Sequence, residues 1–330
     1  MTKSPLELAI IGAGPCGIAA GVSAVKRGVS TLLLDQGFIT DSLVKYPPYM
    51  TFFSTAEKLE IGGIPFVVPR EKPTRLDALV YYRRVVEHFG LRVRQHTKVA
   101  GIRREQGGFR LSLRTRHGEE EPLEARAVVM ATGGFHRPNM LEVPGEDLGK
   151  VFHHYTEAHP FFDQEVLMVG GGNSAVEAAL ELFRARARVT MVHFQHTLDP
   201  GVKPWILPDI RNRLEKGEIG MYWGHRVAEI RPGAVLVVEE GSERTREVAN
   251  DWVFALTGWR GDPSLLEEVG VEVDPESGIP THDPESMETN VPGVFLAGVV
   301  AAGHDANRIF IENGRDHGER ILAALQHRSP

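Results

Sequence analysis

Cysteine is nearly absent from this chain, since Cys16 is the only one among its 330 residues. A single cysteine excludes an internal disulfide, and with it the disulfide framework of many small secreted proteins. It also excludes redox chemistry that stores two electrons in a pair of thiols of one chain. Disulfide chemistry by this protein would need a disulfide brought in from outside.

An excess of basic residues is also missing. Asp and Glu number 44 against 37 Lys and Arg, which gives a net charge of -7 and a pI near 6.1. A nucleic-acid surface needs clustered positive charge to neutralise phosphates. We therefore expect no nucleic-acid partner.

Long apolar runs are missing as well, because none approaches the ~20 residues of a membrane span. The chain passes from Met1-Thr2-Lys3 into a strand-like segment without a cleavage site, so we expect a cytoplasmic protein with no membrane partner. Hydrophobic residues make up 42% of the chain and charged residues 25%, an ordinary balance for a folded protein. The length predicts about two domains of ~150 residues each.

What the chain does have is glycine, gathered in two loops: Gly12-Ala13-Gly14-Pro15-Cys16-Gly17 and Gly170-Gly171-Gly172-Asn173-Ser174-Ala175. Each follows a short apolar run and precedes an alanine-rich stretch. This strand-turn-helix setting is the one that the dinucleotide-binding fingerprint requires. Two such loops indicate a flavoprotein that receives electrons from a nicotinamide cofactor.

In the first loop each glycine has an expected role. Gly12 permits the tight turn, Gly14 lets the backbone approach a pyrophosphate, and Gly17 lets helix and strand pack closely. Asp35 ends the next predicted strand about twenty residues on, where a carboxylate accepts hydrogen bonds from ribose hydroxyls. We expect this loop to bind FAD.

The second loop has Ala175 where a third glycine often stands, and its next strand ends at His193-Phe194-Gln195-His196 without an acid. A carboxylate ~4 Å from a ribose 2′-phosphate would repel it by about 4 kcal/mol per unit charge at an effective dielectric constant of 20. The missing acid favours NADPH over NADH, with His193, Gln195 and His196 as candidate donors. The alternative is that the histidines are ordinary surface residues.

The order of elements predicts an α/β fold with two Rossmann-like domains of the two-dinucleotide-binding flavoprotein type. We expect a discontinuous FAD domain, residues 1–140 and 261–330, carrying an antiparallel β insertion, and an inserted NADPH domain, residues 141–260. The expected elements outside the glycine loops are a helix at 75–89, strands at 91–102, 108–116, 121–130 and 294–298, and a helix at 307–325.

Cys16 lies where the first helix begins, so the helix dipole should favour its thiolate. The alternative is a small residue packed beside the pyrophosphate. The histidines at 153–159 are spaced too loosely for a metal site, and we expect no metal.

Several segments together resemble the low-molecular-weight thioredoxin reductases: both loops, Ala131-Thr132-Gly133, and the stretch from Val291 to Gly298. In that family a Cys-x-x-Cys pair precedes the second loop, where this chain reads His153-His154-Tyr155-Thr156. The dithiol is missing, and thioredoxin reduction with it. The family's Gly-Asp, which holds the ribityl chain of FAD, is replaced by Gly298-Val299, so we expect backbone amides from Val299 onward to take that role.

Longer motifs resemble the bacillithiol disulfide reductase family. They are the stretch from Phe52 to Gly62, Lys203-Pro204-Trp205-Ile206-Leu207-Pro208, the stretch from Ala301 to Asn307, and the stretch from Phe310 to Arg315. The resemblance implies an FAD enzyme that uses NADPH to reduce bacillithiol disulfide, with Cys16 as the redox-active thiol. It gives these expected FAD contacts: Gly12, Gly14, Pro15, Cys16, Gly17, Asp35, Gln36, Tyr46, Phe53, Ser54, Val99, Ala131, Thr132, Gly133, Gly298, Val299, Ala306 and Ile309. The expected NADPH contacts are Gly170, Gly171, Gly172, Asn173, Ser174, Ala175, His193, Gln195 and His196.

The expected reaction is NADPH-dependent reduction of a small external disulfide through the flavin, with Cys16 forming a transient mixed disulfide. Three alternatives stay open at this point: a ferredoxin or flavodoxin reductase of the thioredoxin-reductase-like type, a flavin monooxygenase, and a redox sensor that binds both nucleotides. By analogy with related flavoproteins we expect a homo-oligomer.

Overall fold

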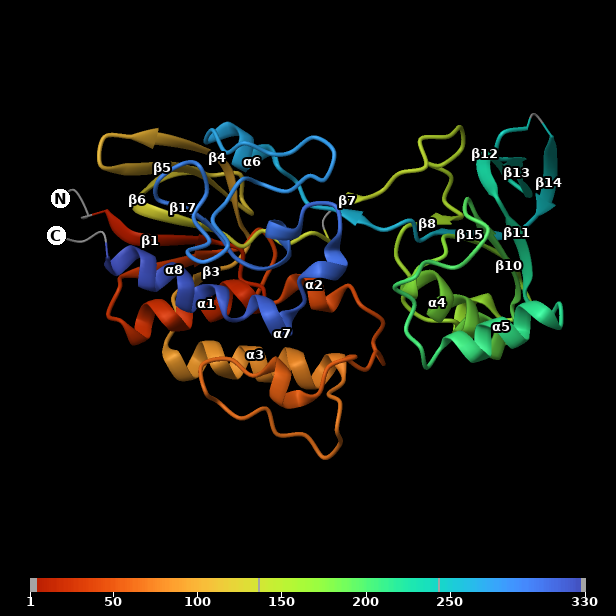
Figure 1. The fold of residues 1–330 in the computed structure, drawn as a ribbon, viewed down its shortest axis with the longest axis horizontal. Helices are drawn as coiled ribbons and strands as arrows, with labels where there is room; N and C mark the ends of the chain where they lie inside the picture. Colours follow the sequence, from red (N-terminus) through yellow and green to blue (C-terminus); the bar gives the residue numbers. More distant parts are fainter. Residues whose placement is uncertain (1–4, 136, 243, 328–330) are drawn as a thin grey trace. The chain divides into compact units, whose positions relative to one another are not determined.

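The structure, a computed structural model, describes residues 5–135, 137–242 and 244–327 (Figure 1). The chain forms two compact units. Unit 1 comprises the described residues of Met1–Val44, Tyr49–Arg137 and Arg260–Pro330, and unit 2 comprises those of Lys45–Pro48 and Pro138–Trp259. Which cofactor each unit binds stays a prediction.

Unit 1 is built on a seven-stranded sheet with the strand order β3-β2-β1-β6-β5-β4, and β17 pairs with β6. Strands β1, β2, β6 and β17 run parallel, so their carboxyl ends meet at one edge of the sheet. The strands of unit 1 are β1 (Leu6–Ile11), β2 (Thr31–Leu34), β3 (Val93–Arg94), β4 (Thr97–Glu105), β5 (Gly108–Thr115), β6 (Glu120–Met130) and β17 (Val294–Leu296).

Helix α1 packs against α8 and α3 (Figure 1). Gly318 of α8 makes the first contact possible, because a Cβ there would lie 2.6 Å from the Cα of Ala20. This close approach fixes the last segment of the chain on the first βαβ unit. The helices of unit 1 are α1 (Pro15–Lys26), α2 (Asp41–Val44), η1 (Ala56–Leu59), α3 (Arg75–Phe89), α6 (Ser264–Glu268), η3 (Gly298–Ala302), η4 (Ala306–Arg308), α7 (Ile311–Gly314) and α8 (His317–Gln326).

The expected strand at 91–102 is two strands. It divides at His96, whose φ is +52°. On one side β3 pairs parallel with β2, and on the other β4 pairs antiparallel with β5. The first half of β6 continues the antiparallel ladder with β5, and its second half pairs parallel with β1. The predicted β insertion is thus continuous with the main sheet.

The prediction of a single helix at 307–325 is wrong, because the structure has three separate elements there, η4, α7 and α8. Gly314 ends α7, and a Cβ at this position would lie 2.8 Å from the Sγ of Cys16. The amide of Phe310 donates to the Asn313 side chain at 2.7 Å, which starts a new turn. Contacts with the first loop therefore break a segment whose sequence pattern is helical.

Unit 2 has three layers. A parallel sheet with the order β11-β10-β9-β15-β8 is covered on one face by α4 and α5, whose buried residues include Val176 and Ile210. Its other face packs against an antiparallel sheet, β12-β13-β14, through residues such as Leu167 and Val235. The elements are β8 (Val151–Phe152), η2 (His159–Phe161), β9 (Glu165–Val169), α4 (Asn173–Arg184), β10 (Arg188–His193), α5 (Leu207–Glu215), β11 (Gly220–Trp223), β12 (His225–Arg231), β13 (Ala234–Glu239), β14 (Thr245–Ala249) and β15 (Trp252–Ala255).

The chain passes between the units on either side of Lys45–Pro48, and again at β7 (Arg137–Pro138) and β16 (Trp259–Arg260), which form a two-stranded sheet. The crossings at β7 and β16 lie within the glycine- and proline-rich stretches at 133–145 and 258–263. None of the described helices combines the length and the apolar character needed to cross a bilayer.

Candidate functional site

The first glycine loop is packed tightly on two of its glycines and open at the third. A Cβ at Gly12, whose φ is +113°, would lie 2.2 Å from the Ala131 oxygen, and one at Gly17 would lie 2.1 Å from the Gly12 oxygen. At Gly14 a Cβ would meet nothing within 4 Å. Only the middle glycine therefore faces space that a pyrophosphate can approach, just ahead of Pro15 at the start of α1.

Asp35 connects this loop to the end of β2. Its Oδ2 accepts from the amide of Ala13 at 2.7 Å, and its Oδ1 accepts from the amide of Gly37 at 2.8 Å. A carboxylate at the end of this strand is the group that accepts ribose hydroxyls in dinucleotide-binding folds. Gln36 lies between Asp35 and Gly37 in the chain. This geometry suits the expected ribose contact and also fixes the loop.

The loops that follow β1, β6 and β17 meet at the carboxyl edge of the unit 1 sheet. The amide of Ala131 donates to Ile11 at 2.8 Å, and the amide of Ala297 donates to Met130 at 2.9 Å. Thr132 and Gly133 follow β6 beside the first loop, while Gly298 and Val299 follow β17. The structure thus brings these predicted FAD contacts together around Gly12.

Cys16 is enclosed by two glycines from the C-terminal segment. A Cβ at Gly298 would lie 2.9 Å from its Sγ, and one at Gly314 would lie 2.8 Å from it. Although the residue keeps intermediate exposure, burial raises the pKa of its thiol to about 12. This direction is opposite to the one expected from the helix dipole, and its cause is desolvation of the thiol.

His317 is a site residue that the sequence analysis missed. It begins α8, is 6% exposed, and its Nδ1 accepts from the amide of Gly298 at 3.2 Å. Burial lowers the pKa of His317 to about 4, with the positive charge of Arg320 as a smaller cause. A neutral ring that accepts at Nδ1 carries its proton on Nε2. His317 thus holds the backbone turn that packs against Cys16.

Two of the family-like motifs contact each other in unit 1. The hydroxyl of Ser54 donates to Glu312 at 2.8 Å. Arg315 donates to the carbonyl oxygens of Glu57 at 2.9 Å and Glu60 at 2.7 Å. The segment at 52–62 is therefore fastened to α7 and the residue that follows it, beside Phe53, which is 36% exposed.

The remaining predicted FAD contacts differ in their placement. Val99 is buried in β4 beside the irregularity in its pairing with β5. Ala306 lies in η4, and the side chain of Ile309 packs near Gly314. Tyr46 belongs to Lys45–Pro48, which groups with unit 2. Burial raises the pKa of Tyr46 to about 12.

In unit 2 the second loop repeats this construction. A Cβ at Gly170, whose φ is +137°, would lie 2.5 Å from the Leu256 oxygen and 3.2 Å from the Cβ of Ala175. Asn173 begins α4; its side chain donates to the Gly201 oxygen at 2.9 Å and accepts from the amide of Lys203 at 2.9 Å. The loop with its exposed Ser174 is thus tied to the segment that follows β10.

The end of β10 differs from the sequence-based picture. His193 is 3% exposed, and a Cβ at Gly171 would lie 2.6 Å from its ring. Its Nε2 lies 3.3 Å from an oxygen of Asp199, and Oδ2 of the same carboxylate would lie 3.0 Å from a Cβ at Gly172. An acid therefore stands beside the loop, although none ends the strand. Gln195 and His196 are exposed.

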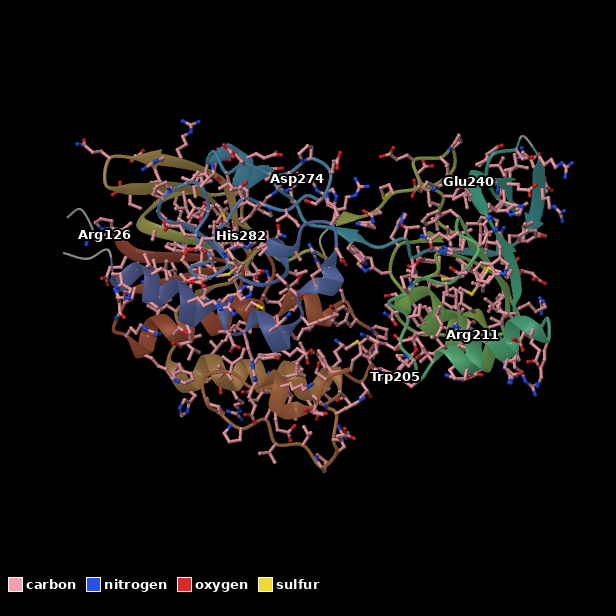
Figure 2. All side chains as sticks on the ribbon, viewed as in Figure 1. Arg126, Trp205, Arg211, Glu240, Asp274 and His282 are labelled. Atoms are coloured by element: carbon pink, nitrogen blue, oxygen red, sulfur yellow. The ribbon has the colours of Figure 1, made fainter. Side chains whose placement is uncertain are left out.

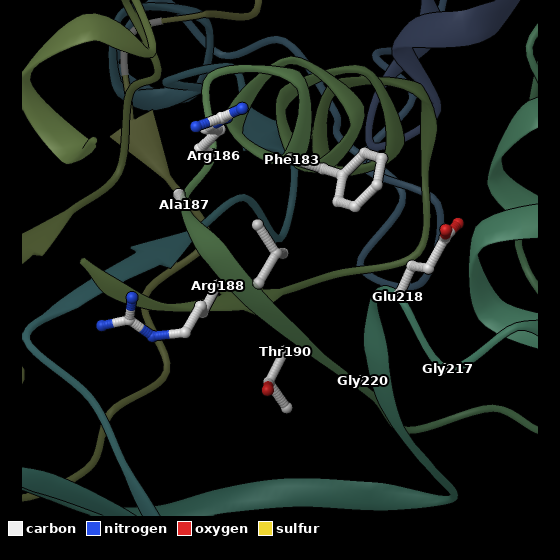
Figure 3. A pocket seen from close by; sticks show the side chains of 9 residues that line it. Phe183, Arg186, Ala187, Arg188, Thr190, Gly217, Glu218 and Gly220 are labelled. Carbon is white, nitrogen blue, oxygen red and sulfur yellow. The ribbon is translucent and has the colours of Figure 1, made fainter. Parts of the chain in front are cut away.

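A cavity of about 550 Å³ lies elsewhere in unit 2 (Figure 3). Arg188 and Thr190, at the start of β10, and Gly220, at the start of β11, contribute to its lining. Because these strands are parallel to β9, the cavity is at the edge opposite the glycine loop. No group of three or more potential metal ligands was found in the described parts of the chain.

The sequence profile of the pyridine nucleotide-disulphide oxidoreductase family matches residues 9–298. Bacilliredoxin reductase Bdr of Bacillus subtilis (strain 168) is 43% identical over 319 residues, which are 97% of each chain. The structure of bacillithiol disulfide reductase Bdr from Bacillus cereus has a TM-score of 0.96 and 41% identity, covering 99% of this chain and 100% of the other. The corresponding structure from Staphylococcus aureus has a TM-score of 0.92 and 39% identity, with coverage of 99% and 100%.

The family explains the pair of glycine loops. Its members are oxidoreductases that use FAD and NAD(P)H, and the open space at Gly14 between packed neighbours suits a dinucleotide. The named relatives belong to the family that the long motifs resemble. Hydrogen bonds between two of these motifs join the 52–62 segment to Glu312 and Arg315. This chain belongs to the pyridine nucleotide-disulphide oxidoreductases and, within them, to the bacillithiol disulfide reductase (Bdr) family.

Proposed function

We propose that the protein uses NADPH and FAD to reduce the disulfide of a low-molecular-weight thiol, bacillithiol disulfide, to two thiols. The balanced reaction consumes one NADPH and one proton for each disulfide. Two relatives of known structure that align over their whole length are named for this activity. We assign FAD to unit 1 and NADPH to unit 2.

One observation carries this proposal: two dinucleotide loops occur in a chain that owns one thiol. A single thiol forms no disulfide within the chain, so the disulfide that accepts the electrons must be external. In addition, burial keeps that thiol protonated, with a pKa of about 12. This favours reduction of the substrate without a covalent bond to Cys16 over the mixed-disulfide route expected from the resemblance.

FAD bound at the first loop would supply the two-electron relay between nicotinamide and disulfide. Residues of the chain around the first loop are placed to bind FAD. Asp35 is placed to accept from ribose, and Gly14 leaves room for the pyrophosphate. His317 fixes the amide of Gly298 and stays neutral at physiological pH. Cys16 fills the space between loop and turn.

The test is NADPH oxidation by the FAD-loaded protein with four acceptors side by side: bacillithiol disulfide, glutathione disulfide, coenzyme A disulfide and ferredoxin. We expect turnover with bacillithiol disulfide to exceed that with the other three. Equal turnover with the three disulfides would contradict the proposed substrate. Turnover with ferredoxin alone would establish the ferredoxin reductase alternative, and stoichiometric incorporation of oxygen into an amine or sulfide would support the monooxygenase alternative.

A second candidate acceptor is bacilliredoxin, because the Bacillus subtilis relative is named as its reductase. In this case the disulfide is carried by a protein rather than by a free small molecule. Adding oxidised bacilliredoxin without free bacillithiol distinguishes the two. Turnover under these conditions supports the protein acceptor, and turnover only after bacillithiol is added supports the small molecule.

The proposal extends to location and assembly. A chain with one cysteine has no internal disulfide that a reducing compartment could break, which supports a location in the cytoplasm. Related flavoproteins support a homo-oligomer. Cell fractionation tests the first, and light scattering at several protein concentrations tests the second.

A further inference from the structure

The adenosine ribose of a dinucleotide lies beside the end of the second strand of its βαβ unit. In unit 2 this place is the end of β10. His193 stands there, but its ring is buried against Gly171, with Nε2 beside Asp199. Both ring nitrogens of His193 are buried, so neither is exposed to a phosphate. A charged donor from another element is therefore a candidate for recognising the ribose phosphate.

Arg226, the second residue of β12, reaches this place. The carbon of its guanidinium lies 4.5 Å from the centre of the Phe194 ring, which is 44% exposed directly after β10. Its Nε donates to Glu240 at 2.8 Å. Glu240 directly follows β13 and is labelled in Figure 2. The guanidinium is thus fixed on one edge by a carboxylate and on one face by an aromatic ring.

The terminal nitrogens of Arg226 remain open. Within the described parts of the chain, Nε is the only atom of this side chain with a hydrogen bond, and the side chain is 55% exposed. A planar guanidinium offers its two terminal nitrogens as a fork that matches two oxygens of one phosphate. The Glu240 bond and the Phe194 ring orient this fork before any ligand arrives.

The backbone around Arg226 is tied to the segment after β10. The amide of Gly224 donates to the Gln195 oxygen at 3.1 Å, and its carbonyl accepts from Glu240 at 2.7 Å. His196 packs against the same glycine, because a Cβ there would lie 2.6 Å from its ring. Arg226 and Phe194 are therefore held in register by the turn before β12.

We propose that Arg226, seated on Phe194 and oriented by Glu240, binds the 2′-phosphate of NADPH and sets the preference for NADPH over NADH. The proposal deepens the proposed function, because it rests on unit 2 binding the nicotinamide cofactor. The missing acid at the end of β10 does not by itself favour NADPH, because Asp199 lies beside the loop. An arginine that binds the 2′-phosphate favours NADPH directly. Because Arg226 is already paired with Glu240, what it offers the phosphate is its fork of donors rather than surplus positive charge.

The test measures binding without turnover. Isothermal titration calorimetry of the FAD-loaded protein would compare adenosine 2′,5′-bisphosphate, which carries the 2′-phosphate, with 5′-AMP, which lacks it. For Arg226→Gln we expect binding of the bisphosphate to weaken about 10- to 100-fold, the effect of losing a charge-assisted fork, and binding of 5′-AMP to stay the same. Arg226→Lys should lie between, because an ammonium keeps the charge but not the fork.

Arg231→Gln is the matched control. Arg231 ends the same strand and pairs with Glu229 and Glu247, so its loss should leave both affinities unchanged. Equal affinity of wild type and Arg226→Gln for the bisphosphate would overturn the proposal. So would equal weakening of both ligands, which indicates a structural role. Because no disulfide enters this test, a wrong acceptor in the proposed function would leave its result unaffected.

Discussion

The chemistry of Cys16 depends on residues nearly 300 positions away in the chain. Its place at the start of α1 predicts a reactive thiolate, but Gly298 and Gly314 pack against the sulfur and burial raises the pKa of the thiol to about 12. Charge on a sulfur that is removed from water is costly unless a cation compensates it. We therefore expect the lone thiol of this protein to be protonated at neutral pH.

Alkylation of Cys16 tests this state. With a pKa of about 12, only about one thiol in 10,000 is ionised at pH 8. In the native protein we expect the rate with iodoacetamide to rise about tenfold per pH unit from pH 7 to 10, because each unit raises the thiolate fraction tenfold. Mass spectrometry of the Cys16 peptide gives the rate. The unfolded chain is the control and should level off between pH 9 and 10, because the pKa of an ordinary thiol is about 8.5. A rate that levels off by pH 10 in the native protein would refute the raised pKa.

His317 makes stability depend on pH. Its folded pKa of about 4 lies below the ordinary histidine value, so the unfolded chain binds a proton that the folded chain does not. This contribution to stability is complete above pH ~6.5 and is lost as the pH falls toward 4, with a size of about 3 kcal/mol. We expect His317→Asn, which retains an acceptor, to remove this part of the pH dependence.

Urea unfolding at several pH values between 4 and 7.5 measures the effect. His88→Gln, on the exposed surface of α3, serves as the control and should keep the wild-type pH dependence. An unchanged pH profile in the His317 variant would show that another group is responsible.

At the scale of elements, the sequence predicts the helices and strands whose formation depends on interactions between residues close together in the chain. Strands at Leu6–Ile11 and Thr31–Leu34 and the helix Arg75–Phe89 lie where the apolar periodicity and the glycines place them. Helix α3 also carries its own capping box, from Thr74 to Asp77. The sequence analysis assigned nothing to β12, β13 and β14. The approach of Gly318 to Ala20, the position of Asp199 and the bond from Gly298 to His317 are tertiary contacts, which no local pattern reveals.

The first loop provides an element-scale prediction. Gly12→Ala forces a Cβ to within 2.2 Å of a backbone oxygen at a positive φ, so we expect a loss of both fold stability and bound FAD. Gly14→Ala adds a Cβ in open space, so we expect a stable apoprotein that binds FAD more weakly. The ratio of flavin to protein absorbance and the melting temperature of the apoproteins separate the two. Normal flavin content in Gly14→Ala would show that the pyrophosphate does not approach there.

The fastening of the 52–62 segment is a second element-scale prediction. Arg315→Ala removes two hydrogen bonds to the carbonyls of Glu57 and Glu60. Each bond from a charged donor contributes about 1.5–3 kcal/mol, so local opening should become easier. Hydrogen exchange should speed up within residues 56–61. Arg320→Ala, which loses one bond to Pro284, is the control and should leave this segment unchanged. Wild-type exchange rates in Arg315→Ala would contradict the proposed fastening.

At the scale of the whole molecule, two dinucleotide-type units share a chain with a single cysteine. The family was accessible from sequence because glycine turns and long motifs are local. The state of Cys16 and the residues around the adenosine ribose were not, because both depend on segments that meet only in the fold. In the proposed reaction, electrons from NADPH reach an external disulfide without a thiol of the protein.

The most direct test is anaerobic reduction of bacillithiol disulfide by FAD-loaded Cys16→Ala, with NADPH oxidation and thiol release followed together. The account predicts two thiols released per NADPH, at a rate within about threefold of wild type. Loss of thiol release in this variant, with FAD still bound and reducible by NADPH, would contradict the account and restore Cys16 to the reaction.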